Sequence, residues 1–154
     1  MSAQHVPLDY VNSLSFELQK AFWDERGRGA RFRMTTVGRE YFRERVLPRI
    51  QSTDLGEIAA TVEQALQESG IAARVTHVFD DRLIRLRIEG CLHLGVEEKM
   101  AAHGVEPFTC VPANILVLAL EEKLKRPVEL AEIKLVDGHC EPLLVLFDKR
   151  PDLE

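Results

Sequence analysis

The sequence predicts an α+β domain in which two β-hairpins form an antiparallel sheet and a long apolar helix packs on that sheet. Two stretches rich in β-branched residues each divide around a short polar turn, at residues 80–82 and 137–139. The most apolar segment of the chain starts at Pro112, between the two hairpins. Strands and single helices do not alternate along the chain, which argues against a parallel doubly wound sheet.

Three helices are expected before the first hairpin. Residues 1–11 show little periodicity and are interpreted as a leader, after which Asn12 or Ser13 caps a helix that runs to about Trp23. A second helix is expected from Thr35 or Thr36 to Val46, because apolar residues recur there at helical spacing. The third helix begins at Asp54, has the capping-box residue Glu57 three positions later, and ends at Gly70.

The rest of the chain supplies the sheet and its covering helix. The expected strands cover 71–79, 83–88, 128–136 and 141–147, with a short helix at 96–102. In the second strand Ile84, Leu86 and Ile88 alternate with two arginines, so one face is expected to be buried and the other wet. The helix from Pro112 carries basic residues at its end, as the helix dipole favours, and is expected to be the central buried helix.

Length and composition indicate one domain over residues 1–154, with a leader and first helix at 1–35 and a ligand-binding-like core at 36–148. The longest apolar run, 115–120, is too short to span a bilayer, and no signal peptide is recognised, so a cytoplasmic location is predicted. A net charge of −5 disfavours nucleic acid as a partner. Eight arginines between Arg26 and Arg49 form a basic stretch, interpreted as a solvated or paired face or as a docking face.

No nucleotide-binding, serine-hydrolase or zinc-protease motif is present, so no reaction class is predicted. Three cysteines, an odd number, argue against a disulfide framework. The chemically versatile side chains lie at expected strand ends and loops: Cys91, His93, Cys110, His139 and Cys140. Three roles stay open for the cysteines, namely metal ligands, buried structural thiols and a reactive or ligand-contacting thiol.

Several short motifs of the C-terminal half resemble the vinyl-4-reductase domain family, a family of small-molecule-binding domains related in fold to heme nitric-oxide sensors and to Golgi trafficking subunits. The resemblance covers residues 36–148 and rests on the segments 88–91, 106–110, 128–132 and 137–140. It implies a zinc site in which a cysteine before the long helix joins an acidic residue and further cysteines. Cys110, Glu132, Gly138 and Cys140 match in order, whereas Leu135 or a neighbour stands where a middle cysteine is expected.

The leading hypothesis is a non-catalytic homodimeric domain that binds a hydrophobic, aromatic or tetrapyrrole-like ligand between the central helix and the sheet. The expected pocket walls are apolar side chains from both elements: Phe108, Ile115, Leu118, Ile84, Leu86 and Phe147. If a metal is bound, zinc being the first choice, Cys110 and Cys140 are its expected central ligands, joined by Cys91 and by one of Glu132, His93 or His139. The alternatives are a thiol- or metal-dependent enzyme using Cys91 or Cys110 and a protein-interaction subunit that docks through its basic stretch.

Overall fold

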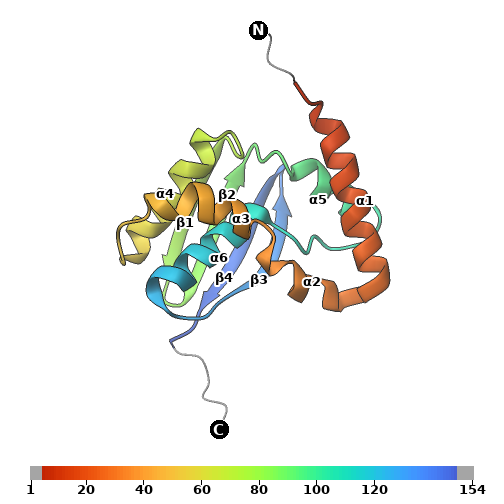
Figure 1. The fold of residues 1–154 in the computed structure, drawn as a ribbon. Helices are drawn as coiled ribbons and strands as arrows, with labels where there is room; N and C mark the ends of the chain where they lie inside the picture. The colour runs from red at the N-terminus through yellow and green to blue at the C-terminus, as the bar shows by residue number, and fades with distance from the viewer. Residues whose placement is uncertain (1–4, 149–154) are drawn as a thin grey trace.

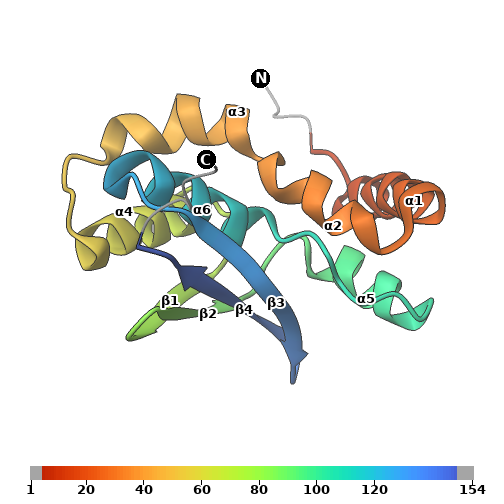
Figure 2. The ribbon, with the colours of Figure 1, turned by 90° about the horizontal axis from the view of Figure 1, so that it is seen from below.

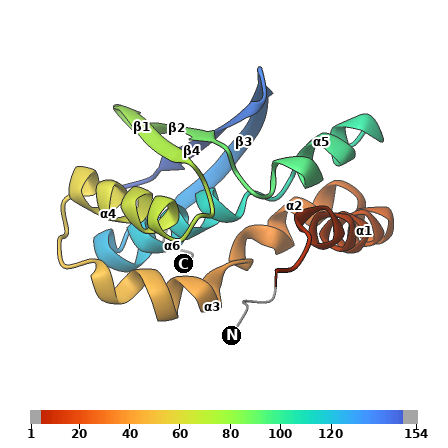
Figure 3. The same cartoon turned by 90° about the horizontal axis from the view of Figure 1, so that it is seen from above.

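The computed structural model describes residues 5–148, apart from the side chains of Arg31 and Phe32. It confirms the α+β class: a four-stranded antiparallel sheet has the order β1-β2-β4-β3, and helices α4 and α6 cover one of its faces. The α3 segment lies over α4 and α6 on the side away from the sheet, and α1, α2 and α5 stand beside this stack (Figures 1, 2 and 3). The molecule therefore has two neighbouring regions: the sheet with its covering helices, and the group formed by α1, α2 and α5.

Both predicted hairpins are present. The strands are β1, Arg74–Asp80; β2, Leu83–Glu89; β3, Val128–Val136; and β4, His139–Leu146. In β2 the alternating Ile84, Leu86 and Ile88 are buried, as predicted, while the arginines between them face water. The two hairpins join through β2 and β4, where Ile84 pairs with Leu144 and Ile88 pairs with Cys140. This register places Cys140 on the face that the helices cover, because cross-strand partners share a face.

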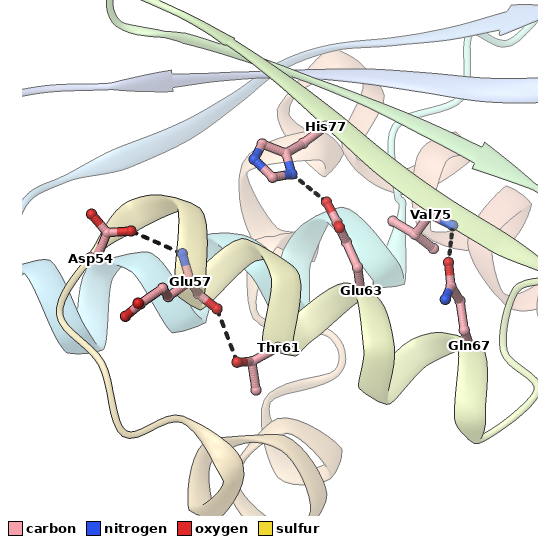
Figure 4. Close-up of polar contacts among 7 residues, drawn as sticks. All are labelled: Asp54, Glu57, Thr61, Glu63, Gln67, Val75 and His77. Atoms are coloured by element: carbon pink, nitrogen blue, oxygen red, sulfur yellow. Dashed lines mark hydrogen bonds and ion pairs between the residues drawn. The ribbon is translucent and has the colours of Figure 1, made fainter.

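Helix α4, Leu55–Glu68, begins where the capping pattern predicts (Figure 4). The Asp54 carboxylate accepts a hydrogen bond from the Glu57 backbone N–H at 3.1 Å. In a full capping box the Glu57 side chain would accept from the backbone N–H of Asp54. Here it accepts from the hydroxyl of Ser52 instead. Two contacts tie α4 to β1: the Gln67 side chain accepts from the Val75 N–H at 2.7 Å, and Glu63 pairs with His77.

Helix α6, Val111–Leu124, is the buried central helix that the sequence predicts. Cys110 is its extended N-cap residue and Pro112 lies in its first turn, where a missing N–H costs nothing. Ile115, Leu116 and Leu120 are at most 1% exposed, because α6 lies between the sheet and the α3 segment. The helix ends at Lys125, which adopts a left-handed conformation with φ 55°.

The N-terminal helices differ from the prediction. Helix α1 is Leu8–Arg26, so the helix begins with Pro7 as its N-cap residue and the expected leader over 1–11 is wrong from residue 8 onward. The apolar residues of its first turns, such as Leu8 and Tyr10, are exposed, which is why no buried stripe signalled the start. A 3-10 turn at Gly27–Gly29, helix α2 at Ala30–Arg33 and a 3-10 turn at Met34–Thr36 follow.

The expected continuous helix from Thr35 or Thr36 to Val46 is also wrong. The chain is extended at Val37 and left-handed at Gly38, which has φ 102°, so the helical path is interrupted. A Cβ on Gly38 would lie 3.1 Å from Val111 Cγ1, so this break lets the backbone approach α6 closely. Helix α3, Arg39–Tyr41, then continues into a π-helical stretch, Phe42–Val46, and a 3-10 turn, Leu47–Arg49.

Helix α5, Leu94–Ala102, starts two residues before the expected short helix and packs against α1. Contacts between the two helices include Lys99 Nζ, which donates to Ser13 Oγ at 2.9 Å, and a ring contact between Phe16 and His103. Among residues 5–148 no helix combines the length and the hydropathy needed to cross a bilayer. The arginines of the basic stretch whose side chains are described are all exposed, and Arg49 pairs with Glu68 at 3.0 Å.

Candidate metal centre

Three buried ligand-type side chains converge where α5, α6 and β4 meet. Glu97, Cys110 and Cys140 each offer one atom, and these three atoms lie within 4.8 Å of one another. The three residues are 3%, 1% and 1% exposed, respectively. Thus the structure brings together two of the predicted metal ligands and adds a carboxylate, Glu97, that is not among the ligands expected from the sequence.

Each of the three positions has a local cause. Cys110 precedes the first turn of α6, and its carbonyl accepts from the Asn114 N–H at 2.9 Å. Cys140 is the second residue of β4 and faces the helices because it pairs with Ile88 and Leu135. Glu97 lies in the first turn of α5, between the buried Val96 and Met100. The cluster therefore depends on three elements that are distant in sequence.

Cys91 lies beside this cluster, just after β2, and is itself buried. Its sulfur accepts a hydrogen bond from the His93 backbone N–H at 3.4 Å. Burial raises the pKa of the Cys91 thiol to about 12, and the neighbouring Glu97 and Cys140 act in the same direction. Cys91 is the third free cysteine and lies outside the converging group of Glu97, Cys110 and Cys140.

The pKa values of Glu97 and Cys110 are both raised, and burial contributes to each shift. It raises the pKa of Glu97 to about 7, although a hydrogen bond from Cys140 favours the charged carboxylate. The pKa of Cys110 is raised well above its ordinary value, first by its hydrogen bond with Cys140 and then by burial. One Glu97 oxygen, Oε2, has no hydrogen-bond partner among the described residues. A buried carboxyl oxygen without a partner is costly in a folded protein.

The raised thiol pKa values bear on the predicted catalytic alternative. A nucleophilic cysteine needs a lowered pKa, because the thiolate is the attacking species. Burial raises the pKa of Cys91, and the hydrogen bond with Cys140 together with burial raises the pKa of Cys110, which is the opposite direction; all three cysteines are free thiols rather than disulfides. A cation at the cluster would reverse this balance, because thiolates and carboxylates are the forms that bind metals.

The other expected ligands are placed elsewhere or differently. Glu132 is exposed on β3, and so lies outside the converging group. His139 is buried at the start of β4, where its Nε2 lies 3.1 Å from a Glu141 carboxyl oxygen. His93 is the N-cap residue of α5, and burial lowers the pKa of its imidazole. Neither histidine is among the atoms that converge with Cys110 and Cys140.

Glu97 is not among the ligands expected from the sequence, yet the structure buries it in the cluster. A signal was present: Leu94, Glu97 and Met100 recur every three residues, which places the carboxylate on the apolar face of α5. Because the predicted helix began at residue 96, it left out Leu94, and the apolar face that includes Glu97 was not recognised. A charged residue on an apolar face indicates either a partner or a ligand.

The expected apolar pocket residues do not gather around a single opening in the described structure. Ile84, Leu86 and Ile115 belong to the main core and are at most 1% exposed. Leu118 lines a cleft of about 390 Å³ between α3 and α6, and Phe108 lines a separate cleft of about 710 Å³ beside β3. Phe147, which follows β4, is 36% exposed.

Comparison with known proteins adds no identification: neither a protein-family model nor a curated protein matches this sequence. The chemistry of the side chains therefore carries the functional argument. Within the described residues, the group formed by Glu97, Cys110 and Cys140 is the one with metal-ligand spacing.

Proposed function

We propose that this protein is a non-catalytic metal-binding domain that holds one thiophilic divalent cation, with Zn²⁺ as the reference ion. Glu97, Cys110 and Cys140 would be its ligands, and Cys91 would complete a four-coordinate site. The observation that carries the proposal is the buried Glu97 oxygen that lacks a hydrogen-bond partner beside two buried thiols. Two or three thiolates with one carboxylate form a donor set that suits Zn²⁺.

The spacing supports this assignment. Ligand atoms around a tetrahedral zinc stand about 3.7 Å apart, as Zn–S bonds of about 2.3 Å require. The three atoms lie within 4.8 Å of one another, so their approach to a cation needs displacements of about an ångström, within the reach of side-chain rotation. The burial of all three residues favours a structural or regulatory ion over a catalytic one, because a catalytic ion keeps a position open to substrate.

The resemblance to the vinyl-4-reductase domain family also supports a site at Cys110 and Cys140, since that resemblance implies zinc near the closing cysteines. In this proposal Glu97 supplies the acidic ligand that the resemblance assigns to Glu132. The difference is testable, because Glu132 is exposed and can be changed without disturbing the core.

The experiment is a titration of the reduced, metal-free protein with Co²⁺ and then with Zn²⁺. We expect one equivalent of Co²⁺ to produce a thiolate-to-metal absorption band, which Zn²⁺ then removes. Affinity should fall as the pH drops, because protons compete for the ligands. Cys110→Ser, Cys140→Ser and Glu97→Gln should each weaken binding by at least tenfold, the effect expected for lost ligands or their close supports.

Two matched controls accompany these variants. Glu98→Gln changes the exposed neighbour of Glu97, and Glu132→Gln changes the alternative acidic ligand. Both should bind Co²⁺ as the wild type does. Circular dichroism of each metal-free variant separates lost binding from lost folding. Absence of stoichiometric binding to the folded wild type, or unchanged binding after both cysteine substitutions, would refute the proposed site.

A further inference from the structure

A second feature of the molecule, apart from the cysteine cluster, has the size of a ligand site. A cleft of about 710 Å³ separates strand β3 from the helical region at its side. This volume lies within the usual range for small-molecule sites. Its helical wall comes from the end of α1, the turn after α1 and the loop at 104–108, and its other wall is residues 130–135 of β3.

The strand register decides which side chains of β3 enter this cleft. Ile133 pairs with Pro142, and Leu135 pairs with Cys140, so both side chains face the helical side of the sheet. Glu132 and Lys134 alternate with them and project from the opposite face. The strand wall therefore presents Ile133 and Leu135 toward the helices, and the charged Glu132 and Lys134 also line the cleft.

The helical wall presents aromatic rings. The rings of Trp23 and Phe108 have centroids 5.3 Å apart and are tilted by 34°. Phe108 is 7% exposed and belongs to the second hydrophobic cluster, so the ring pair is held in place by packing. The half-buried Trp23 ring therefore lines the cleft with the buried Phe108 ring as its support, and it offers a planar ligand an aromatic surface.

Arg28 gives the cleft a free cation. It stands between Gly27 and Gly29 in the 3-10 turn after α1, is exposed and lines the cleft. Across the described residues, no hydrogen bond or ion pair is found for its guanidinium. Glu106 on the loop is the acidic side chain on the same wall. An unpaired guanidinium is suited to a carboxylate, which it can bind through two parallel hydrogen bonds.

We infer that this cleft binds a planar aromatic carboxylate. The aromatic ring of the ligand lies against Trp23 and Phe108, its far edge contacts Ile133 and Leu135, and its carboxylate pairs with Arg28. The inference does not depend on the proposed metal site, because none of the three converging ligands lines this cleft.

The test uses 2-naphthoate as the anionic probe and 2-naphthylmethanol as its neutral counterpart. Isothermal titration calorimetry measures affinity and stoichiometry, and Trp23, the one tryptophan of the chain, reports occupancy of the cleft by fluorescence. We expect one naphthoate per chain with a change in Trp23 emission. Arg28→Gln should weaken naphthoate by about tenfold or more, the effect of losing a charge-assisted hydrogen bond.

Two further substitutions frame the result. Arg45→Gln removes an exposed arginine that lines neither cleft and should leave naphthoate affinity unchanged. Glu106→Gln removes a like charge from the cleft wall and should strengthen naphthoate binding. The neutral alcohol should bind the wild type more weakly than naphthoate does. Its affinity for the Arg28→Gln variant should equal its affinity for the wild type.

The inference is overturned if naphthoate shows no saturable binding to the folded wild type. It is equally overturned if Arg28→Gln binds naphthoate as tightly as the wild type, or if acid and alcohol bind the wild type alike. Repeating the titration with Cys110→Ser separates the two proposals. That variant should keep naphthoate binding while losing metal binding, so either proposal can fail without the other.

Discussion

The two hydrophobic clusters of this protein differ in the secondary-structure elements that enclose them. The main cluster lies between the sheet and helices α4 and α6, and the backbone ladders of four strands form one of its walls. The second cluster lies between α1, α5 and the loop that precedes α6, and its buried members are fewer: Ala30, Val96, Met100, Val105 and Phe108. Side-chain packing between helices and loops, with no strand ladder, holds the second cluster together.

The residues of the proposed metal site come from the regions of both clusters. The cysteines belong to the main cluster, whereas Glu97 is carried by α5 of the second region. The cleft beside β3 likewise has one wall from each region. Both proposed sites therefore lie at the boundary between the two regions. A cation bound by Glu97, Cys110 and Cys140 would connect the two regions directly.

The largest expected effect is on stability, and it comes from placing an aspartate in each of the two clusters in turn. Leu116→Asp or Leu120→Asp puts an unpaired carboxylate into the main core, so loss of the cooperative thermal transition is expected. Met100→Asp in the second cluster should lower the melting temperature but retain the β-sheet signal in circular dichroism. An unchanged transition in the leucine variants would contradict the central position of α6. Complete unfolding of Met100→Asp would show that the two regions fold as one unit.

The next effect concerns pH and the metal-free protein. The pKa of Glu97 is about 7 in the folded chain against an ordinary 4.5, so the folded state holds this proton more tightly than the unfolded state does. The contribution of this group to stability is full below about pH 4.5 and is lost as the pH rises to about 7, with a total of roughly 3 kcal/mol. Denaturant unfolding across this range measures it.

Glu97→Gln provides the comparison for this pH dependence, because it keeps the shape and removes the titrating group. The difference in unfolding free energy between wild type and variant should change across pH 4.5–7 and be flat above that interval. A saturating cation should suppress the decline in the wild type, since the bound carboxylate carries no proton. Equal pH profiles for the two metal-free proteins would contradict the burial of this carboxyl group.

Asn114 links the two regions and gives an intermediate effect. Its side-chain nitrogen donates to the carbonyls of Met34 and Val37 at 2.9 and 3.1 Å, and the residue is 1% exposed. Asn114→Ala should destabilise the fold by about 2 kcal/mol, because it removes two hydrogen bonds that each contribute about 1 kcal/mol, while the Met34 carbonyl keeps the Val37 N–H as a donor. Chemical denaturation measures the loss, with Gln64→Ala on the exposed face of α4 as the control. A loss as small as that of the control would show that the 34–37 turn is held by other contacts.

The smallest expected effect lies at the edge of the main region. Asp54→Ala removes the carboxylate that caps α4, at an expected cost of about 1 kcal/mol. Asp54→Asn retains an acceptor and should recover most of that loss. The pair of variants tests whether the cap acts through its hydrogen bond, and equal stabilities for Ala and Asn would show that it does not.

Much of the main region was predictable because its signals are local. The Asp54 cap, the alternation of Ile84, Leu86 and Ile88, and the polar hairpin turns each depend on residues close in sequence. The break at Gly38 was missed for the opposite reason. Its cause is the approach of that backbone to Val111, more than seventy positions away in the chain.

The sequence by itself determined the α+β class, the two hairpins and the central helix. It also determined that Cys110 lies just before the central helix and that Cys140 lies near the start of the last strand. Only the tertiary structure decided that Glu97 joins them and that Glu132 does not. The physical reason is that a periodic pattern shows which face of an element is buried, whereas the partner across that face depends on packing between distant segments. Ligand sets and clefts are made of such partners, so the packing of α5 in the second cluster, beside α1, decided the site.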